Sequence, residues 1–206
     1  MNDEEAVRCC QHGAPEAFRH VVEEYGKVLY GTAYLMTRDP DTAEDLVQEA
    51  FLSAWKGIRS FDIGRPLKPW LMRILVNEVM TYRRRRSLAT TSLEEGMEPE
   101  GNDDPAELAE TKDSSEQVRR ALESLSEEHK QVVILKYFDD LSVPEISSVL
   151  KCPTGTVKSR LHRALDQLRQ GVASDQYIRS GGDVKESFYS ARAGTKAKGL
   201  LLGGDL

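Results

Sequence analysis

Two short helices joined by a tight turn are encoded between residues 142 and 168, and this pattern constrains the fold more than any other. Ser142 is a good N-cap, Glu145 stands three residues later, and Pro144 falls in the first turn, where its missing N–H costs no hydrogen bond. Pro153 disfavours helical geometry at the residue before it, so the first helix is expected to stop there. The second helix is predicted from Pro153 to the end of the range. This arrangement is typical of a helix-turn-helix.

The second of these helices has two unlike faces. Five apolar residues repeat at helical spacing and are expected to face a core: Val157, Leu161, Ala164, Leu165 and Leu168. Another part of the surface carries hydroxyl and basic residues: Thr156, Lys158, Ser159, Arg160 and Arg163. Guanidinium groups bond guanine edges in a major groove, and short hydroxyls reach phosphates or bases. DNA binding is one interpretation. An ordinary solvated basic face is the other, because helix-turn-helix geometry also occurs in proteins that bind no DNA.

An earlier helix is predicted to begin at Asp39, a good N-cap, with Pro40 at the first helical position. Its buried face is predicted to hold Ala43, Leu46, Val47, Ala50, Phe51 and Ala54. The opposite face is acidic with one apolar residue: Glu44, Asp45, Gln48, Glu49 and Leu52. Such a face suits a basic partner helix, although taken alone it is equally typical of a solvated surface.

A loop rich in Gly and Pro precedes a third informative helix, which ends in a run of four arginines at 83–86. Its predicted buried stripe is Trp70, Leu71, Ile74, Leu75, Val79 and Tyr82. On another face Arg73, Asn77, Met80 and Arg84 line up. Amide and guanidinium groups on one exposed stripe suit unstacked bases and phosphates. The arginine run favours either nonspecific phosphate binding or stabilisation of a helix C-terminus by cations.

Three motifs follow one another along the chain. They are residues 45–49, DLVQE, within their helix; residues 70–74, WLMRI, followed by Asn77; and residues 155–164, GTVKSRLHRA. In this order and spacing they resemble regions two and four of the extracytoplasmic-function sigma factors of bacterial RNA polymerase. The resemblance covers residues 10 to 170.

The resemblance implies a role for each surface. In that family the acidic helix docks on the clamp helices of the largest polymerase subunit, here through Asp45, Gln48, Glu49 and Leu52. The loop and the helix after it bind the minus-ten element and capture a flipped base of the non-template strand, here through Phe61, Asp62, Arg65, Arg73, Asn77 and Arg84. The last helix enters the major groove of the minus-thirty-five element through Thr156, Lys158, Ser159, Arg160 and Arg163.

The resemblance also predicts the partners. They are core RNA polymerase with its beta and beta-prime subunits, promoter DNA, and a cognate anti-sigma factor. Extruding the first base costs a few kcal/mol, which a fitted pocket offsets while it recognises sequence. No catalytic residue, cofactor or metal site is expected. Two other classes of protein are possible interpretations. One is a helix-turn-helix regulator that is not a polymerase subunit, and the other is an antagonist that occupies polymerase without recognising DNA.

The predicted fold class is all-α, with two small helical domains at 10–88 and 114–170. One further helix in the first domain is predicted from the spacing of Phe18, Val21, Val22, Tyr25, Leu29 and Ala33. In the second domain two helices are expected beneath the helix-turn-helix, separated by the cap Ser126, with Val118, Leu122, Leu125, Val132, Val133, Leu135 and Phe138 as their apolar residues. No segment shows sustained strand alternation.

Charge is distributed unevenly along the chain, which has a net charge of -6. Residues 91–117 hold ten acids and one base, which leaves the rest of the chain at +3. The segment 89–113 is therefore predicted to be an acidic flexible linker. It either imitates nucleic acid inside the polymerase cleft, as the resemblance implies, or is simply a solvated tether. The tail at 171–206 is predicted to be disordered, as either a regulatory extension or an inert end.

Three cysteines, Cys9, Cys10 and Cys152, show no metal-ligand spacing and favour reduced thiols. No signal peptide or membrane span is apparent, so a cytoplasmic location without membrane insertion is expected. Three residues depart from the family's usual pattern. Lys151 stands where the turn usually has glycine, which predicts a left-handed non-glycine residue, Cys152 replaces a larger aliphatic residue, and Thr81 replaces an aspartate.

Overall fold

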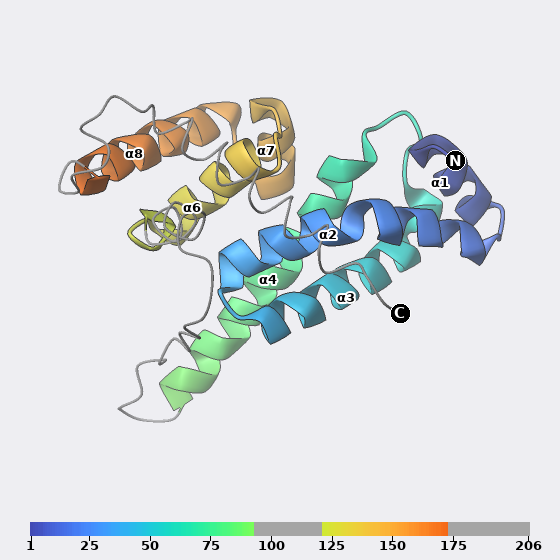
Figure 1. Ribbon diagram of the computed structural model, residues 1–206, viewed down its shortest axis with the longest axis horizontal. Coiled ribbons are helices and arrows are strands. Elements are labelled where there is room, and N and C mark those ends of the chain that lie inside the picture. The colour runs from blue at the N-terminus through green and yellow to red at the C-terminus, as the bar shows by residue number, and fades with distance from the viewer. Residues whose placement is uncertain (93–120, 173–206) are drawn as a thin grey trace, which may run out of the picture.

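Two groups of helices pack against each other in the computed structural model, which describes residues 1–92 and 121–172 (Figure 1). The first group holds α1 (Asp3–Gln11), α2 (Phe18–Thr37), α3 (Pro40–Gly57) and α4 (Leu67–Ser92), with short 3-10 turns at Pro15–Ala17 and Ile58–Ser60. The second holds α6 (Glu127–Val133), a π turn at Ile134–Phe138, α7 (Val143–Leu150) and α8 (Thr154–Val172). The described residues contain no strand, which confirms the all-α prediction.

The predicted segment boundaries meet the structure only in part. Helix α4 continues to Ser92, four residues into the segment predicted as linker. The rest of that acidic segment, the predicted helical residue Val118, and the tail beyond residue 172 lie outside the described residues. Along 1–92 and 121–172, no helix has the length and apolar character needed to span a bilayer.

Side-chain caps begin the helices where the sequence predicts them. Asp39 accepts from the Thr42 backbone N–H at 3.3 Å, and the Thr42 hydroxyl, also bonded to this carboxylate, is the main cause that lowers the pKa of Asp39. Ser142 forms a reciprocal capping box with Glu145, and Ser126 caps α6. These three predicted helix starts are confirmed.

Helix α1 was not predicted, and Val22 was assigned to the wrong face. Asn2 and Glu5 form a capping box that starts α1, which buries Ala6 and Val7 against the core. On α2 the side chain of Val22 is 39% exposed, because the fully buried Val21 lies on the inner face of this helix and Val22 does not. The apolar pattern of α2 is wider than one face, so periodicity alone misplaced its edge.

The second domain packs on a stripe of α4 that the sequence did not identify as buried. Met72 and Val76 are buried. Lys68, Met80 and Arg83 lie on the same face of α4, because positions 68, 72, 76, 80 and 83 follow one another at intervals of four or three residues. Those three flanking residues all contact the second domain: Lys68 donates to the Asp139 carbonyl, Met80 lies 2.8 Å from Gln131 Nε2, and Arg83 pairs with Glu127. Two buried faces on α4 therefore serve two different domains.

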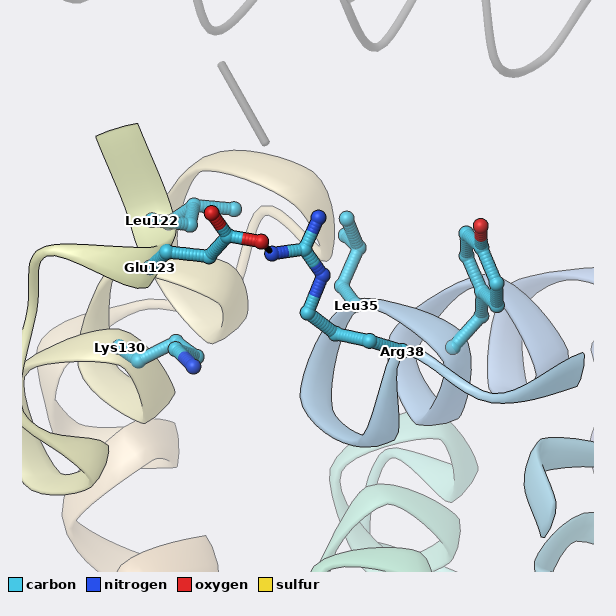
Figure 2. Close-up of a pocket in the computed structure, with 6 residues that line it drawn as sticks. Leu35, Arg38, Leu122, Glu123 and Lys130 are labelled. Atoms are coloured by element: carbon cyan, nitrogen blue, oxygen red, sulfur yellow. Dashed lines mark ion pairs between the residues drawn. The ribbon is translucent and has the colours of Figure 1, made fainter. Parts of the chain in front are cut away.

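The contact between the domains includes buried polar groups. All four buried polar or charged side chains in the described ranges lie there: Thr32, Lys130, Gln131 and Asp139. The Thr32 hydroxyl of α2 is 2.9 and 3.1 Å from the two carboxylate oxygens of Asp139. Figure 2 shows Arg38, the C-cap residue of α2, and Glu123 of the second domain pointing toward each other as an ion pair, with Lys130 below. Burial lowers the pKa of Lys130, and the nearby charges of Arg83 and Arg38 lower it further.

We expect Thr32→Val to destabilise the chain by about 1–3 kcal/mol, because the buried Asp139 carboxylate loses a hydrogen-bond donor. Valine keeps the volume and shape of the side chain, so packing is preserved. Urea denaturation of the full chain measures the free energy of unfolding. Thr32→Ser retains the hydroxyl and is the matched control. Equal stability of the valine and serine variants would show that this hydrogen bond contributes nothing.

Candidate nucleic-acid and protein interfaces

The outer face of α3 presents the predicted docking residues to solvent. Four of them are exposed polar residues of one face, and the apolar Leu52 among them is 51% exposed: Glu44, Asp45, Gln48, Glu49 and Leu52. The opposite face of α3 packs on α2 and α4 through the predicted residues Ala43, Leu46, Val47, Ala50 and Ala54. The core therefore fixes the orientation of this acidic face.

Trp55, which the sequence did not single out, lies one turn after Leu52 and is 38% exposed. Its ring packs edge-on against Phe18, with centroids 5.3 Å apart. A tryptophan on a helix whose other face is already buried is the signal that could have identified it. Exposed Trp55 and Leu52 give the acidic face an apolar end.

The loop before α4 is ordered at its tip and anchored at its base. At the tip, the Asp62 carboxylate accepts from the Gly64 N–H at 3.2 Å and pairs with the Arg65 guanidinium at 3.3 Å. Both charged side chains are exposed, as a DNA-contacting role requires. Phe61 differs from them, since it is only 8% exposed and its ring lies 4.8 Å from that of Trp70. Phe61 therefore packs in the core at the base of the loop, and little of its ring is accessible to a base.

The predicted polar stripe on α4 is exposed beside the interdomain contact. Arg73, Asn77 and Arg84 are all exposed. Each comes one position after a residue of the stripe on the second-domain side of α4, namely Met72, Val76 and Arg83. The arginine run at 83–86 divides between two environments. Arg83 turns inward to Glu127 and the Met36 carbonyl, while Arg84 faces solvent. Since α4 continues to Ser92, the interpretation of the run as a helix C-terminus is wrong.

The turn of the helix-turn-helix is held by a residue that the sequence did not single out. Lys151 adopts the predicted left-handed conformation, with φ 50° and ψ 42°, and its side chain is exposed. The Ser147 hydroxyl donates to the Cys152 carbonyl at 2.6 Å, and the Ser147 carbonyl accepts from the Cys152 N–H at 3.2 Å. These bonds offset the roughly 1 kcal/mol that a non-glycine residue costs in this conformation.

Helix α8 places most of its predicted contact residues in solvent. Lys158, Ser159 and Arg163 are exposed and Thr156 is partly exposed, while Val157, Ala164 and Leu168 are buried beneath them as predicted. Arg160 is the exception. Its guanidinium pairs with Glu128 of α6 at 2.8 Å, which leaves the side chain 22% exposed. Arg160 therefore already has an acidic partner within the domain.

We expect Glu128→Gln to strengthen binding of upstream promoter duplex, because it frees Arg160 and removes a negative charge near the phosphates. A partly exposed ion pair contributes up to about 1 kcal/mol, which sets the gain at up to about fivefold. Fluorescence anisotropy with a labelled duplex measures the dissociation constant. Glu23→Gln, the same charge change on an exposed α2 residue, is the control. Weaker binding by the Glu128 variant would show that Arg160 acts only together with Glu128.

Known proteins match this chain in sequence and in fold. Residues 21–88 match Sigma-70 region 2, and residues 115–168 match Sigma-70, region 4. The ECF RNA polymerase sigma factor SigW of Bacillus subtilis is 31% identical over 180 residues, which is 80% of this chain and 93% of SigW. The ECF RNA polymerase sigma-E factor of Escherichia coli strain K12 is 32% identical over 184 residues, 84% of this chain and 95% of that relative.

Two solved structures share the arrangement of helices. The sigma factor RpoE of Bartonella quintana, in complex with the anti-sigma factor NepR, has a TM-score of 0.61 at 26% identity and covers 77% of this chain and 98% of its own. CnrH, in complex with the cytosolic domain of CnrY, has a TM-score of 0.63 at 24% identity over 84% of this chain and 99% of its own, which shows the fold alone.

Proposed function

We propose that three surfaces of this chain, which belongs to the extracytoplasmic-function sigma factors, each bind a different partner or promoter element. It is an alternative sigma factor that acts with core RNA polymerase in transcription initiation. In our proposal residues 10–88 dock on polymerase and bind the minus-ten element, and residues 114–170 bind the minus-thirty-five element. RNA synthesis itself is left to the polymerase, and the chain works in the cytoplasm without catalytic residues of its own.

The observation that carries the proposal is the opposite charge of two exposed faces on adjacent helices. The α3 face is acidic around Asp45 and Glu49, so phosphate backbones repel it and a protein partner suits it. The α4 face carries Arg73, Asn77 and Arg84, which suit phosphates and unstacked bases. Docking through the first face leaves the second open to a DNA strand.

A helix-turn-helix regulator that never joins polymerase is the weaker candidate. It leaves the acidic α3 face without a partner, and it does not account for the match of residues 21–88 to Sigma-70 region 2. An anti-sigma factor is the further partner that we infer, because the Bartonella quintana sigma factor RpoE is found in complex with one.

Run-off transcription with core polymerase and a genomic promoter library tests the proposed function. Transcripts that appear only when the protein is added are the expected result, and their start sites define the promoter sequences. Absence of stimulated transcripts from every template would contradict a sigma function.

We expect Asp45→Arg to weaken association with core polymerase at least about tenfold, since like charges placed together at an interface cost several kcal/mol. Affinity for immobilised core, measured by surface plasmon resonance, gives the effect. Glu23→Arg makes the same charge reversal at an exposed site on α2 and serves as the control. Similar losses in both variants would point to net charge rather than to a specific docking face.

Asn77→Ala is expected to impair promoter opening more than the first binding step, because Asn77 is proposed to contact only unpaired bases. One base contact contributes about 1–3 kcal/mol. Permanganate reactivity of melted thymines measures opening, and the upstream footprint measures binding. Wild-type permanganate reactivity in the variant would remove Asn77 from the melting surface.

A further inference from the structure

Gln11, the last residue of α1, donates two hydrogen bonds to the base of the loop before α4. Its side-chain nitrogen Nε2 lies 2.9 Å from the Ile58 carbonyl and 2.8 Å from the Phe61 carbonyl. These contacts connect segments that are 47 and 50 residues apart in sequence. Gln11 precedes the stretch at 21–88 that matches Sigma-70 region 2, and its side chain is partly buried.

The two bonds close one backbone turn. An amide NH₂ group has two hydrogens, and each is directed to a different carbonyl. Between these carbonyls the Phe61 N–H donates to the Ile58 carbonyl at 3.1 Å, so the turn at Ile58–Ser60 ends where Gln11 binds. Phe61 then adopts an extended backbone, with φ -72° and ψ 132°. Gln11 therefore holds the point at which the chain leaves the turn and enters the loop.

Beyond its base, the loop also packs on the core through the partly buried Ile63 and ends at the buried Leu67. Residues 63–67 border an open cleft of about 810 Å³, whose other walls are the first turn of α1 and part of α2. The tip bonds of Asp62 are internal to the loop and do not connect it to the rest of the domain. The base of the loop is connected by the Gln11 hydrogen bonds on one side and by the packing of Phe61 in the core, against Trp70, on the other.

We propose that Gln11 is a positioning residue for the loop at 61–66, and that it sets the geometry with which Asp62 and Arg65 meet the extruded base. This inference rests on the proposed minus-ten function of that loop. A binding site whose parts are fixed before the ligand arrives does not lose affinity to the ordering of those parts. Without the two hydrogen bonds the loop can move into the cleft, and the same side chains then bind the base less selectively.

Gln11→Met tests the proposal, because methionine keeps the length of the side chain and removes both donors. The probe is a promoter obtained from the run-off library, prepared as a forked duplex with each minus-ten base in turn either present or abasic. Preference for the intact base at the most sensitive position is expected to fall roughly fivefold to tenfold, equivalent to the loss of one or two hydrogen bonds. Hydrogen exchange at the amides of Gly64 and Arg65 should become faster.

A merely structural role for Gln11 predicts a different result. Loss of α1 packing would lower core affinity and upstream duplex binding together with base preference, whereas a positioning role leaves these two affinities close to wild type. Cys9→Ser changes an exposed residue on the same helix and should leave every readout unchanged. Wild-type base preference and wild-type exchange in Gln11→Met would overturn the proposal.

Loop variants separate this inference from the function on which it rests. Asp62→Ala and Arg65→Ala should reduce base preference if the loop receives a base. If they reduce it and Gln11→Met does not, the positioning role is wrong and the loop function stands. If none of the three variants alters base preference, the minus-ten function assigned to the loop is wrong.

Discussion

The hydrogen bond between Thr32 and the buried carboxylate of Asp139 marks the contact on which the arrangement of both domains depends. It lies beside the Lys68 bond to the Asp139 backbone, and together these bonds attach the second domain to α2 and α4. A buried carboxylate needs such donors, because desolvation without them costs several kcal/mol. The interface thus includes matched polar groups beside its apolar contacts, as interfaces between separable domains commonly do.

Helix α4 connects this contact to the candidate DNA-binding surface. One face of the helix packs in the first domain through Leu71 and Leu75, and a second face, with Met72, packs against the second domain. What remains exposed is the narrow stripe that includes Arg73 and Asn77. These residues follow directly on the stripe that contacts the second domain, so the proposed minus-ten surface lies beside the domain contact.

The sequence predicted much of the fold, since its signals are local. Caps at Asp39, Ser126 and Ser142 follow from the chemistry of a few neighbouring residues. The left-handed Lys151 follows from the resemblance, because the family's turn usually has glycine there. Burial of Met72 could not be predicted, because it depends on a second domain that no periodicity within α4 reveals. The same holds for the Gln11 bonds and for the pairing of Arg160 with Glu128, which join residues distant in sequence. Most candidate residues are exposed, but the aromatic ring of Phe61 is buried and Thr156 and Arg160 are only partly exposed.

Oxidation of methionines by dilute peroxide, followed by peptide mass spectrometry, tests the domain packing on α4 most directly. Met1 and Met80 are 60% and 45% exposed, whereas Met36 is buried in the first domain and Met72 is buried on the α4 face where Lys68 and Arg83 contact the second. Fast oxidation of Met1 and Met80, with Met36 and Met72 both protected, is the expected result for the free full-length chain. Oxidation of Met72 as fast as that of Met80, with Met36 still protected, would show that the second domain does not pack on this helix.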